Sequence, residues 1–327
     1  MSVLLIGDPH FKTNNKEETD LFCQETYKYL ENNDSPDKII VLGDVLDTHE
    51  KINIRPMIRA TTFLLKLTKY CKDIFVLVGN HDRPDNSVFL GPEHSLFTLK
   101  FTGINIVDNV EIFDDLVFVP YVEPGRFLEA LATKNISEKD LQSGKYKAIF
   151  AHQEFKGAQM GGIVSLMGDE WKKEWTPVYS GHIHDFQIMD NVTYVGTPYQ
   201  TGYSDNSDKG LYLLDTEKNS LEKIKLNIIP KMIRHVKIEE ILELKFDENI
   251  KTKLVIEGDA REIRRMIVEK EYKRKLKGIP YIIKDIPKYV FPEEKEKVIY
   301  TIPKIVEMIK KECDPDEKKI LENIFGQ

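Results

Sequence analysis

The sequence has little of what marks secreted, cross-linked or membrane-spanning proteins. It contains only three cysteines, Cys23, Cys71 and Cys313. Their odd number, wide separation and lack of a Cys-x-x-Cys pair argue against a disulfide framework and a thiolate zinc site. No apolar run approaches the roughly 18 residues of a membrane span, and no basic leader precedes the apolar stretch Val3–Ile6. We therefore expect a soluble protein of the cytoplasm or nucleus that has no membrane partner.

Positive charge is also scarce in the first part of the chain. The 327 residues carry a net charge of −7, but residues 231–327 hold 23 Lys and Arg against 20 Asp and Glu, whereas residues 1–230 hold 24 against 34. A net-negative chain is not an obvious binder of nucleic acid, although bound divalent cations would offset part of the charge. The length allows one large domain and a smaller one, each with a core.

Short apolar runs alternate with helical patterns in the first part of the chain. The spacing of apolar residues predicts helices over Glu17–Glu31 and Arg55–Tyr70. The predicted strands are Val3–Ile6, Ile39–Leu42, Ile74–Val78, Leu116–Val119, Ala148–Ala151, Val178–Ser180, Val192–Val195 and Leu211–Leu214. Strand–helix alternation followed by closely spaced strands predicts an α/β fold, a β-sandwich flanked by helices, over residues 1–229.

A smaller α+β domain is predicted over residues 230–300. Strands are expected at Lys253–Glu257 and Tyr281–Ile283. Between them, Asp259 is a candidate N-cap for a helix that runs to about Leu276. This arrangement is a small β-α-β unit.

Polar side chains follow five of the predicted strands: Gly7-Asp8-Pro9-His10, Gly43-Asp44, Gly79-Asn80-His81-Asp82, His152 and Gly181-His182-Ile183-His184. Carboxyl ends of strands joined by crossovers converge on one crevice, and the glycine ahead of four of them allows a sharp turn. Carboxylate, imidazole and amide oxygen are ligands that suit Mn, Fe or Zn. A lone histidine after a strand is usually structural, but the joint occurrence favours two metals that share one carboxylate, an arrangement used for displacement at phosphorus.

Together these motifs resemble the five motifs of the calcineurin-like metallophosphoesterases, over roughly the first 200 residues. Within that superfamily the chain most resembles the Mre11-type DNA-repair nucleases, called SbcD in bacteria, and their phage relatives. The likeness extends to the Val192–Glu217 stretch, the small second domain and two terminal amphipathic helices over residues 301–327. Many archaeal and eukaryotic members have a second histidine where this chain has Asp47, so Asp47 favours the bacterial and phage branch.

The resemblance implies a role for each strand-end residue. Asp8, His10 and His184 would hold the first metal, Asn80, His152 and His182 the second, and Asp44 would bridge both. Two divalent ions are implied, Mn most of all, with Mg, Fe or Zn as alternatives. His81 would be the catalytic acid that steadies the leaving oxygen, which suits a histidine of near-neutral pKa. Asp82 would either orient His81 or cap a turn, and His49, His94 and His235 are taken as loop or surface residues.

For function, the resemblance implies an exonuclease on double-stranded DNA and an endonuclease on single-stranded DNA. It would act in recombination and double-strand-break repair, in a bacterial, phage-infected or virus-infected cell or a nucleus. The implied partners are a Rad50- or SbcC-type ABC ATPase, which would bind the terminal helices, and a second copy of the chain. The alternatives are another calcineurin-like phosphodiesterase or phosphatase acting on a small or nucleotide substrate, and a scaffold without catalysis.

Candidate DNA contacts are basic residues, because a nuclease must neutralise phosphates. Two lie in loops close to the expected ligands, and the others lie on the helix of the second domain: Arg83, Lys156, Arg261, Arg264, Arg265, Lys273 and Arg274. The alternative for the helix is a solvated face whose charge is balanced by Glu262, Glu269 and Glu271.

Overall fold

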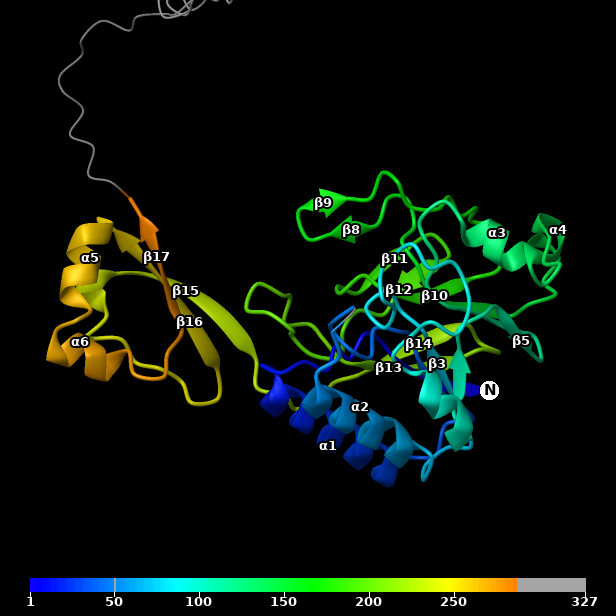
Figure 1. The fold of residues 1–327 in the computed structure, drawn as a ribbon, viewed down its shortest axis with the longest axis horizontal. Helices are drawn as coiled ribbons and strands as arrows, with labels where there is room; N and C mark the ends of the chain where they lie inside the picture. The colour runs from blue at the N-terminus through cyan, green and yellow to red at the C-terminus, as the bar shows by residue number, and fades with distance from the viewer. Residues whose placement is uncertain (50, 287–327) are drawn as a thin grey trace, which may run out of the picture.

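Two six-stranded sheets form the larger part of the molecule (Figure 1). The computed structural model describes residues 1–49 and 51–286, so the helix pair predicted for residues 301–327 lies outside the described residues. The first sheet, in the order β14-β13-β1-β2-β3-β4, consists of β1 (Ser2–Ile6), β2 (Lys38–Val41), β3 (Asp73–Leu77), β4 (Asn105–Val107), β13 (Leu211–Asp215) and β14 (Ser220–Ile224). The second, in the order β11-β12-β10-β7-β6-β5, consists of β5 (Glu111–Phe113), β6 (Leu116–Val119), β7 (Ala148–His152), β10 (Val178–Gly181), β11 (Gln187–Met189) and β12 (Val192–Tyr194).

Side-chain alternation along β1 explains the layers. Val3 and Leu5 lie in the core between the two sheets, whereas Leu4 and Ile6 lie in the core beneath the helices. Because successive residues of a strand face opposite sides, a strand that is apolar throughout must be covered on both faces. The predicted β-sandwich flanked by helices is therefore confirmed.

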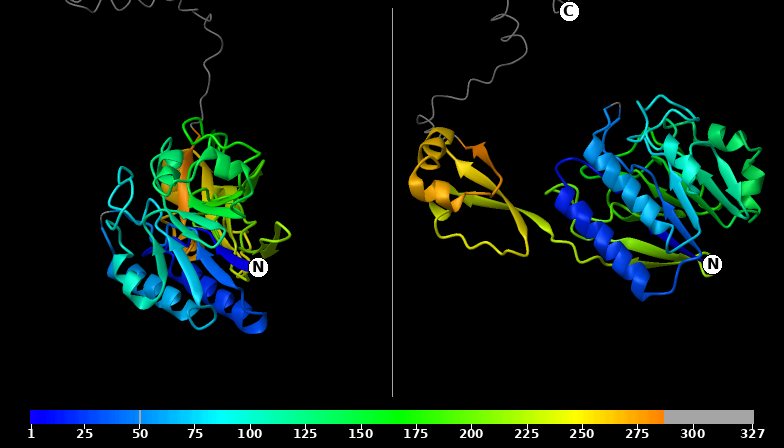
Figure 2. Two further views of the ribbon diagram at one scale, coloured as in Figure 1. Left: turned by 90° about the vertical axis from the view of Figure 1, so that its right-hand side faces the viewer. Right: turned by 60° about the horizontal axis from the view of Figure 1, so that its bottom comes forward.

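Helices cover the outer face of each sheet. On the first sheet lie α1 (Lys16–Asn32) and α2 (Ile54–Leu67), which run side by side in both views of Figure 2 and match the two predicted helices. On the second lie the short helices α3 (Phe127–Ala132) and α4 (Glu138–Gln142). Within the part of the chain that the structure describes, no helix is long and apolar enough to cross a membrane.

The central strands are parallel, and this brings their carboxyl ends together. β1, β2 and β3 pair in parallel in the first sheet, as do β6, β7 and β10 in the second. At the end of this last ladder Gly181 lies opposite His152. Polar residues that follow these strands consequently lie along one edge of the sandwich.

A second sheet unit follows the sandwich. β15 (Lys231–Lys237), β16 (Lys251–Gly258) and β17 (Tyr281–Asp285) form a parallel three-stranded sheet. The predicted N-cap Asp259 does accept hydrogen bonds from the first turn of the helix that follows β16.

The prediction of a single helix between β16 and β17 is wrong. The structure has two separate helices there, α5 (Ala260–Met266) and α6 (Lys270–Lys275), and the backbone at Glu269 is extended (ψ 147°). The break lies at Ile267 and Val268, two β-branched residues, which are weak helix formers. It allows both helices to contribute to one core.

Ion pairs with the buried Glu18 join this unit to the start of α1. Glu18, only 6% exposed, accepts from Lys231 Nζ at 3.0 Å and from Lys251 Nζ at 3.2 Å. Acidic residues in the first turn of a helix also interact favourably with its dipole. The two lysines begin β15 and β16, so the sheet of the second unit is fastened next to the N-terminus of α1.

Asp82 fastens the loops that follow β2 and β3. Its Oδ1 accepts from the Leu46 amide at 3.0 Å, and its Oδ2 accepts from the amides of Val45 at 3.2 Å and Gly79 at 3.1 Å. Of the two roles left open for Asp82, the structure shows the turn cap. Burial and, second, the charge of Asp44 raise the pKa of Asp82 to about 7, although the three amide donors act in the opposite direction.

Removal of this carboxylate should destabilise the fold. We expect Asp82→Ala to lower the free energy of unfolding by about 3 kcal/mol or more, since three buried amides lose their acceptor. Asp82→Asn should cost less because its amide oxygen still accepts. Urea denaturation measures both, with the exposed Asp85 replaced by Ala as the matched control. Equal, small effects at positions 82 and 85 would contradict the assignment.

Candidate metal centre

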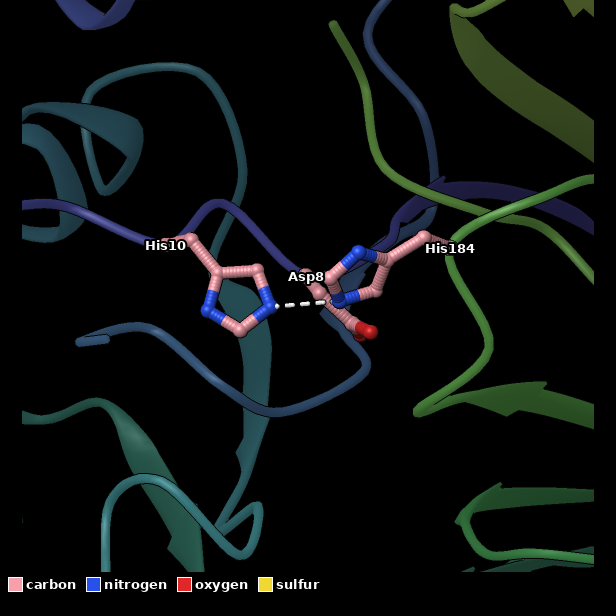
Figure 3. A group of neighbouring side chains, drawn as sticks. All are labelled: Asp8, His10 and His184. Atoms are coloured by element: carbon pink, nitrogen blue, oxygen red, sulfur yellow. Dashed lines mark hydrogen bonds between the residues drawn. The ribbon is translucent and has the colours of Figure 1, made fainter. Parts of the chain in front are cut away.

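One cluster of possible ligands lies where the loops after β1 and β10 meet (Figure 3). Asp8 and His10 are buried and His184 is half-buried, and a ligand atom from each lies within 4.8 Å of the others. The two imidazoles face each other, with 2.9 Å between His10 Nε2 and His184 Nε2. These are the three residues that the resemblance assigned to the first metal.

A second cluster lies next to the first. It contains Asp44, His152 and His182. Asn80 belongs with them, because its Oδ1 lies 3.1 Å from both His152 Nε2 and His182 Nδ1. The set is the one expected for the second metal.

Asp44 lies between the clusters. Its Oδ1 is 3.3 Å from His152 Nε2, and its Oδ2 is 3.8 Å from His10 Nε2. The Oδ1 atom also accepts a hydrogen bond from the His81 amide at 2.9 Å. One oxygen toward each cluster is the arrangement that a bridging carboxylate requires.

The atoms that converge here are mostly acceptors, which fits cations. His152 Nδ1 donates to the Leu42 carbonyl at 2.6 Å, because a carbonyl only accepts, so in the neutral ring the Nε2 lone pair faces Asp44 and Asn80. Asp8 Oδ1 is buried and has no hydrogen-bond partner among the described residues. Buried, unpaired acceptors are costly unless a cation satisfies them, and oxygen and imidazole donors suit divalent metals.

The burial of several carboxylates and imidazoles in one place also changes their pKa values. Burial raises the pKa of Asp8 to about 7. Burial alone would lower the pKa of His152, but the carboxylates of Asp44 and Asp8 outweigh it and raise that pKa to about 9. In the metal-free protein, protons therefore supply part of the positive charge that the carboxylates need.

The glycines ahead of the ligands make room for them. An added β-carbon would lie 2.3 Å from His152 Nδ1 at Gly43, 2.1 Å from Asp44 Oδ1 at Gly79 and 2.3 Å from Asp8 Oδ1 at Gly181. Among these three only Gly43 has a left-handed φ, 105°. The sharp turn predicted for every glycine is thus found at Gly43, whereas Gly79 and Gly181 are needed because the neighbouring ligand approaches so closely.

Two residues without a clear role in the sequence, Asp47 and His49, lie against ligands or neighbours of the site. Asp47 Oδ1 lies 3.3 Å from His10 Nδ1 without a hydrogen bond between them, and its negative charge favours a proton on Nδ1, which directs the Nε2 lone pair to the cluster. The His81 ring stacks on His49, with centroids 4.6 Å apart and planes at 23°. Burial lowers the pKa of His81, while the charge of Asp44 acts against this. The contact with His49 depends on tertiary structure, and no pattern in the sequence indicates it.

The candidate DNA contacts differ in exposure and in the part of the molecule to which they belong. Arg83 is buried, with its Nη2 3.4 Å from the Asp108 carbonyl, so it does not lie at the surface. Lys156 is exposed and paired with Glu170 at 2.6 Å. The remaining candidates are exposed on α5 and α6, in the second unit: Arg261, Arg264, Arg265, Lys273 and Arg274. Figure 1 shows these helices apart from the sandwich.

Comparisons with known proteins agree with this geometry. Residues 1–195 match the family profile "Calcineurin-like phosphoesterase". Two proteins named "Putative phosphoesterase" are similar over most of the chain. The first, 078R of Invertebrate iridescent virus 3, is 38% identical over 79% of this chain and 76% of its own length. The second, 244L of Invertebrate iridescent virus 6, is 36% identical over 80% of this chain and 95% of its own length.

A more distant relative is "Exonuclease subunit 1" of Enterobacteria phage T4, which is 23% identical over 66% of this chain and 64% of its own length. The family match covers more than half of the chain and contains every residue of the two clusters. The chain belongs to the calcineurin-like phosphoesterases, a family of metal-dependent hydrolases of phosphate esters.

Proposed function

We propose that this phosphoesterase is a two-metal DNA nuclease of the Mre11 and SbcD type. The observation that carries the proposal is the similarity to the phage T4 exonuclease subunit, which spans 225 residues and so is not confined to a short motif. The paired clusters around Asp44 support it, because two adjacent cations suit the displacement of an oxygen at phosphorus. The proposed activities are exonuclease on double-stranded DNA and endonuclease on single-stranded DNA.

In this proposal the residues around the two clusters have separate roles in the reaction. Divalent cations in the two clusters would polarise the phosphodiester and activate a water. The Leu42 carbonyl orients the imidazole of His152 through a hydrogen bond, and the carboxylate of Asp47 lies beside the imidazole of His10. His81 faces the substrate and donates a proton to the leaving oxygen. The negative phosphate beside it raises its pKa toward the range in which a histidine can donate.

Partners are part of the same proposal. Exposed basic residues of α5 and α6 would bind DNA phosphates, because several of them gather in the last turn of each helix. Residues 301–327 would bind a Rad50-type ATPase. For a homodimer, α2 exposes Ile54 (75%) and Ile58 (59%), as a helix that packs on a second copy would. The viral and phage relatives favour an infected cell as the place of action.

A second candidate function is hydrolysis of a small or nucleotide phosphodiester by the same centre. The names of the two iridescent-virus relatives favour this second function, because they specify a phosphoesterase and name no DNA substrate. In the first experiment, the protein with Mn²⁺ is given end-labelled duplex DNA, circular single-stranded DNA and bis-p-nitrophenyl phosphate. A nuclease shortens the duplex and opens the circle. Hydrolysis of the small ester with both DNAs intact would contradict the nuclease proposal and favour the second candidate.

His81 should matter for cleavage and not for metal binding. We expect His81→Asn to lower kcat for DNA by about 10²- to 10⁴-fold, the usual contribution of a general acid, while the metal content stays that of the unsubstituted protein. His235→Asn, at an exposed histidine of the second unit, is the matched control. Metal content by mass spectrometry and rates on labelled duplex check both statements. Unchanged cleavage by a metal-loaded His81→Asn variant would remove the proposed role.

Metal binding should release protons. The pKa values of Asp8 and His152 are raised in the metal-free protein, to about 7 and about 9. Both groups hold protons up to those pH values, and a proton and a metal compete for the same site, so Mn²⁺ affinity should increase as pH rises from about 6 to 9. Calorimetric titration in two buffers of different ionisation enthalpy at pH 7 measures the protons released. No release, together with an affinity independent of pH, would contradict this account.

A further inference from the structure

A short ribbon projects from the sandwich beside the metal centre. β8 (Gln159–Met160) and β9 (Ile163–Val164) form it, and Figure 1 shows it beyond the end of the second sheet, above β11 and β12. At its base, the Gln187 side chain bonds both the amide and the carbonyl of Gln159, each at 2.9 Å. The ribbon is therefore held against the sheet that supplies His182.

The ribbon is also linked to a metal ligand. Ser165, just after β9, donates to Glu154 Oε1 at 2.5 Å, and the other oxygen of Glu154 lies 3.9 Å from His182 Nε2. The chain segments that lead into and out of the ribbon are also joined at its base, where the Lys156 amide donates to the Asp169 carbonyl at 3.0 Å. A ribbon fastened in this way has a defined position relative to the site.

One edge of the ribbon, from β9 to the segment just after Ser165, is apolar and exposed. Four large side chains lie within five consecutive residues of it: Ile163 (68% exposed), Val164 (48%), Leu166 (76%) and Met167 (82%). Scattered exposed apolar residues are normal, but a contiguous group usually marks a contact surface.

A cavity of about 440 Å³ separates the ribbon from the metal centre. Met160 and Gly161 of the ribbon line one side, and His182 and His184 line the other. The volume is in the roughly 300–1,000 Å³ range of ligand pockets. A substrate whose phosphate reaches His182 and His184 through this cavity places its neighbouring groups next to the ribbon.

The acidic residues of the cavity already have partners in the protein. Asp185 pairs with Lys209 Nζ at 2.8 Å. Asp205 accepts from the amides of Thr201 and Gly202 and from the Thr201 hydroxyl, at 2.7 to 2.8 Å. Beside the histidines the lining includes Met160, Ile183 and the small polar Ser204, which suit a largely uncharged group better than a second phosphate.

We propose that the β8–β9 ribbon is an apolar wedge that separates the base pair next to the scissile phosphate, and that the cavity beneath it receives the freed nucleoside. This inference rests on the proposed nuclease function and specifies how duplex DNA enters the site. Apolar side chains inserted between base steps unstack them, and a base removed from its stack is held by apolar and small polar contacts. A protein docking on the ribbon is the competing explanation, but the cavity connects the ribbon to the metal ligands, which favours substrate.

The test compares three substrates. Ile163→Ser/Leu166→Ser/Met167→Ser removes three of the four exposed apolar side chains, and Phe101→Ser, at a residue 80% exposed outside the ribbon, is the matched control. On blunt duplex DNA we expect the triple variant to be slower by about tenfold or more. On duplex with a frayed, unpaired end and on bis-p-nitrophenyl phosphate it should match the unsubstituted protein.

A second readout does not depend on cleavage. Duplex DNA with 2-aminopurine next to the cut gains fluorescence when that base is unstacked, and stopped flow records this before cleavage. The gain should occur with the unsubstituted protein and Phe101→Ser and be lost in the triple variant. An equal duplex rate and fluorescence gain in all three proteins would overturn the wedge and favour a protein contact. Equal losses on all three substrates would overturn it in favour of a structural role, and no DNA cleavage by the unsubstituted protein would overturn the nuclease function itself.

Discussion

The close approach of the strand-end ligands to one another is the constraint on which the rest of the structure depends. At Gly79 and Gly181 even a β-carbon would overlap a carboxylate oxygen of a neighbouring ligand. Loops this tightly packed cannot adapt to a larger residue, because they lie at the ends of central parallel strands whose cores on both faces are filled. The sandwich therefore serves as a rigid frame that brings side chains far apart in sequence within bonding distance of two points.

Such convergence concentrates charge, and the surrounding structure compensates for it. Asp8 and Asp44 are buried together, a costly arrangement in the absence of cations. Backbone amides of His182 and His81 donate to them, at 2.8 and 2.9 Å. Asp44 also has a left-handed φ of 47°, unusual outside glycine, and such strain persists only where surrounding contacts enforce it. Asp82, with its three amide donors, is one source of that enforcement.

The sandwich and the members of both clusters follow from the sequence because they obey periodic rules. Apolar strands that end in Gly-Asp or Gly-His must present those residues at one edge, wherever the intervening helices lie. Contacts that depend on where loops fold back follow no such rule, as with the His49 ring on His81. The same holds for β15, in which only Val236 is fully buried, so that Lys231–Lys237 does not read as an apolar strand. The break between α5 and α6 reflects packing of both helices on one core, which overrides a continuous helical pattern.

The chemistry at phosphorus and the choice of substrate therefore reside in different parts of the chain. Two cations held by imidazoles and carboxylates act on a phosphodiester whatever its two ester groups are, so the clusters cannot by themselves distinguish DNA from a small ester. Discrimination has to come from surfaces that touch the rest of the substrate. In the described residues the surfaces that we propose for this are the apolar ribbon beside the cavity and the basic faces of α5 and α6. Both are exposed elements under little packing constraint, which is why strand-end motifs identify the family of this protein much more sharply than its substrate.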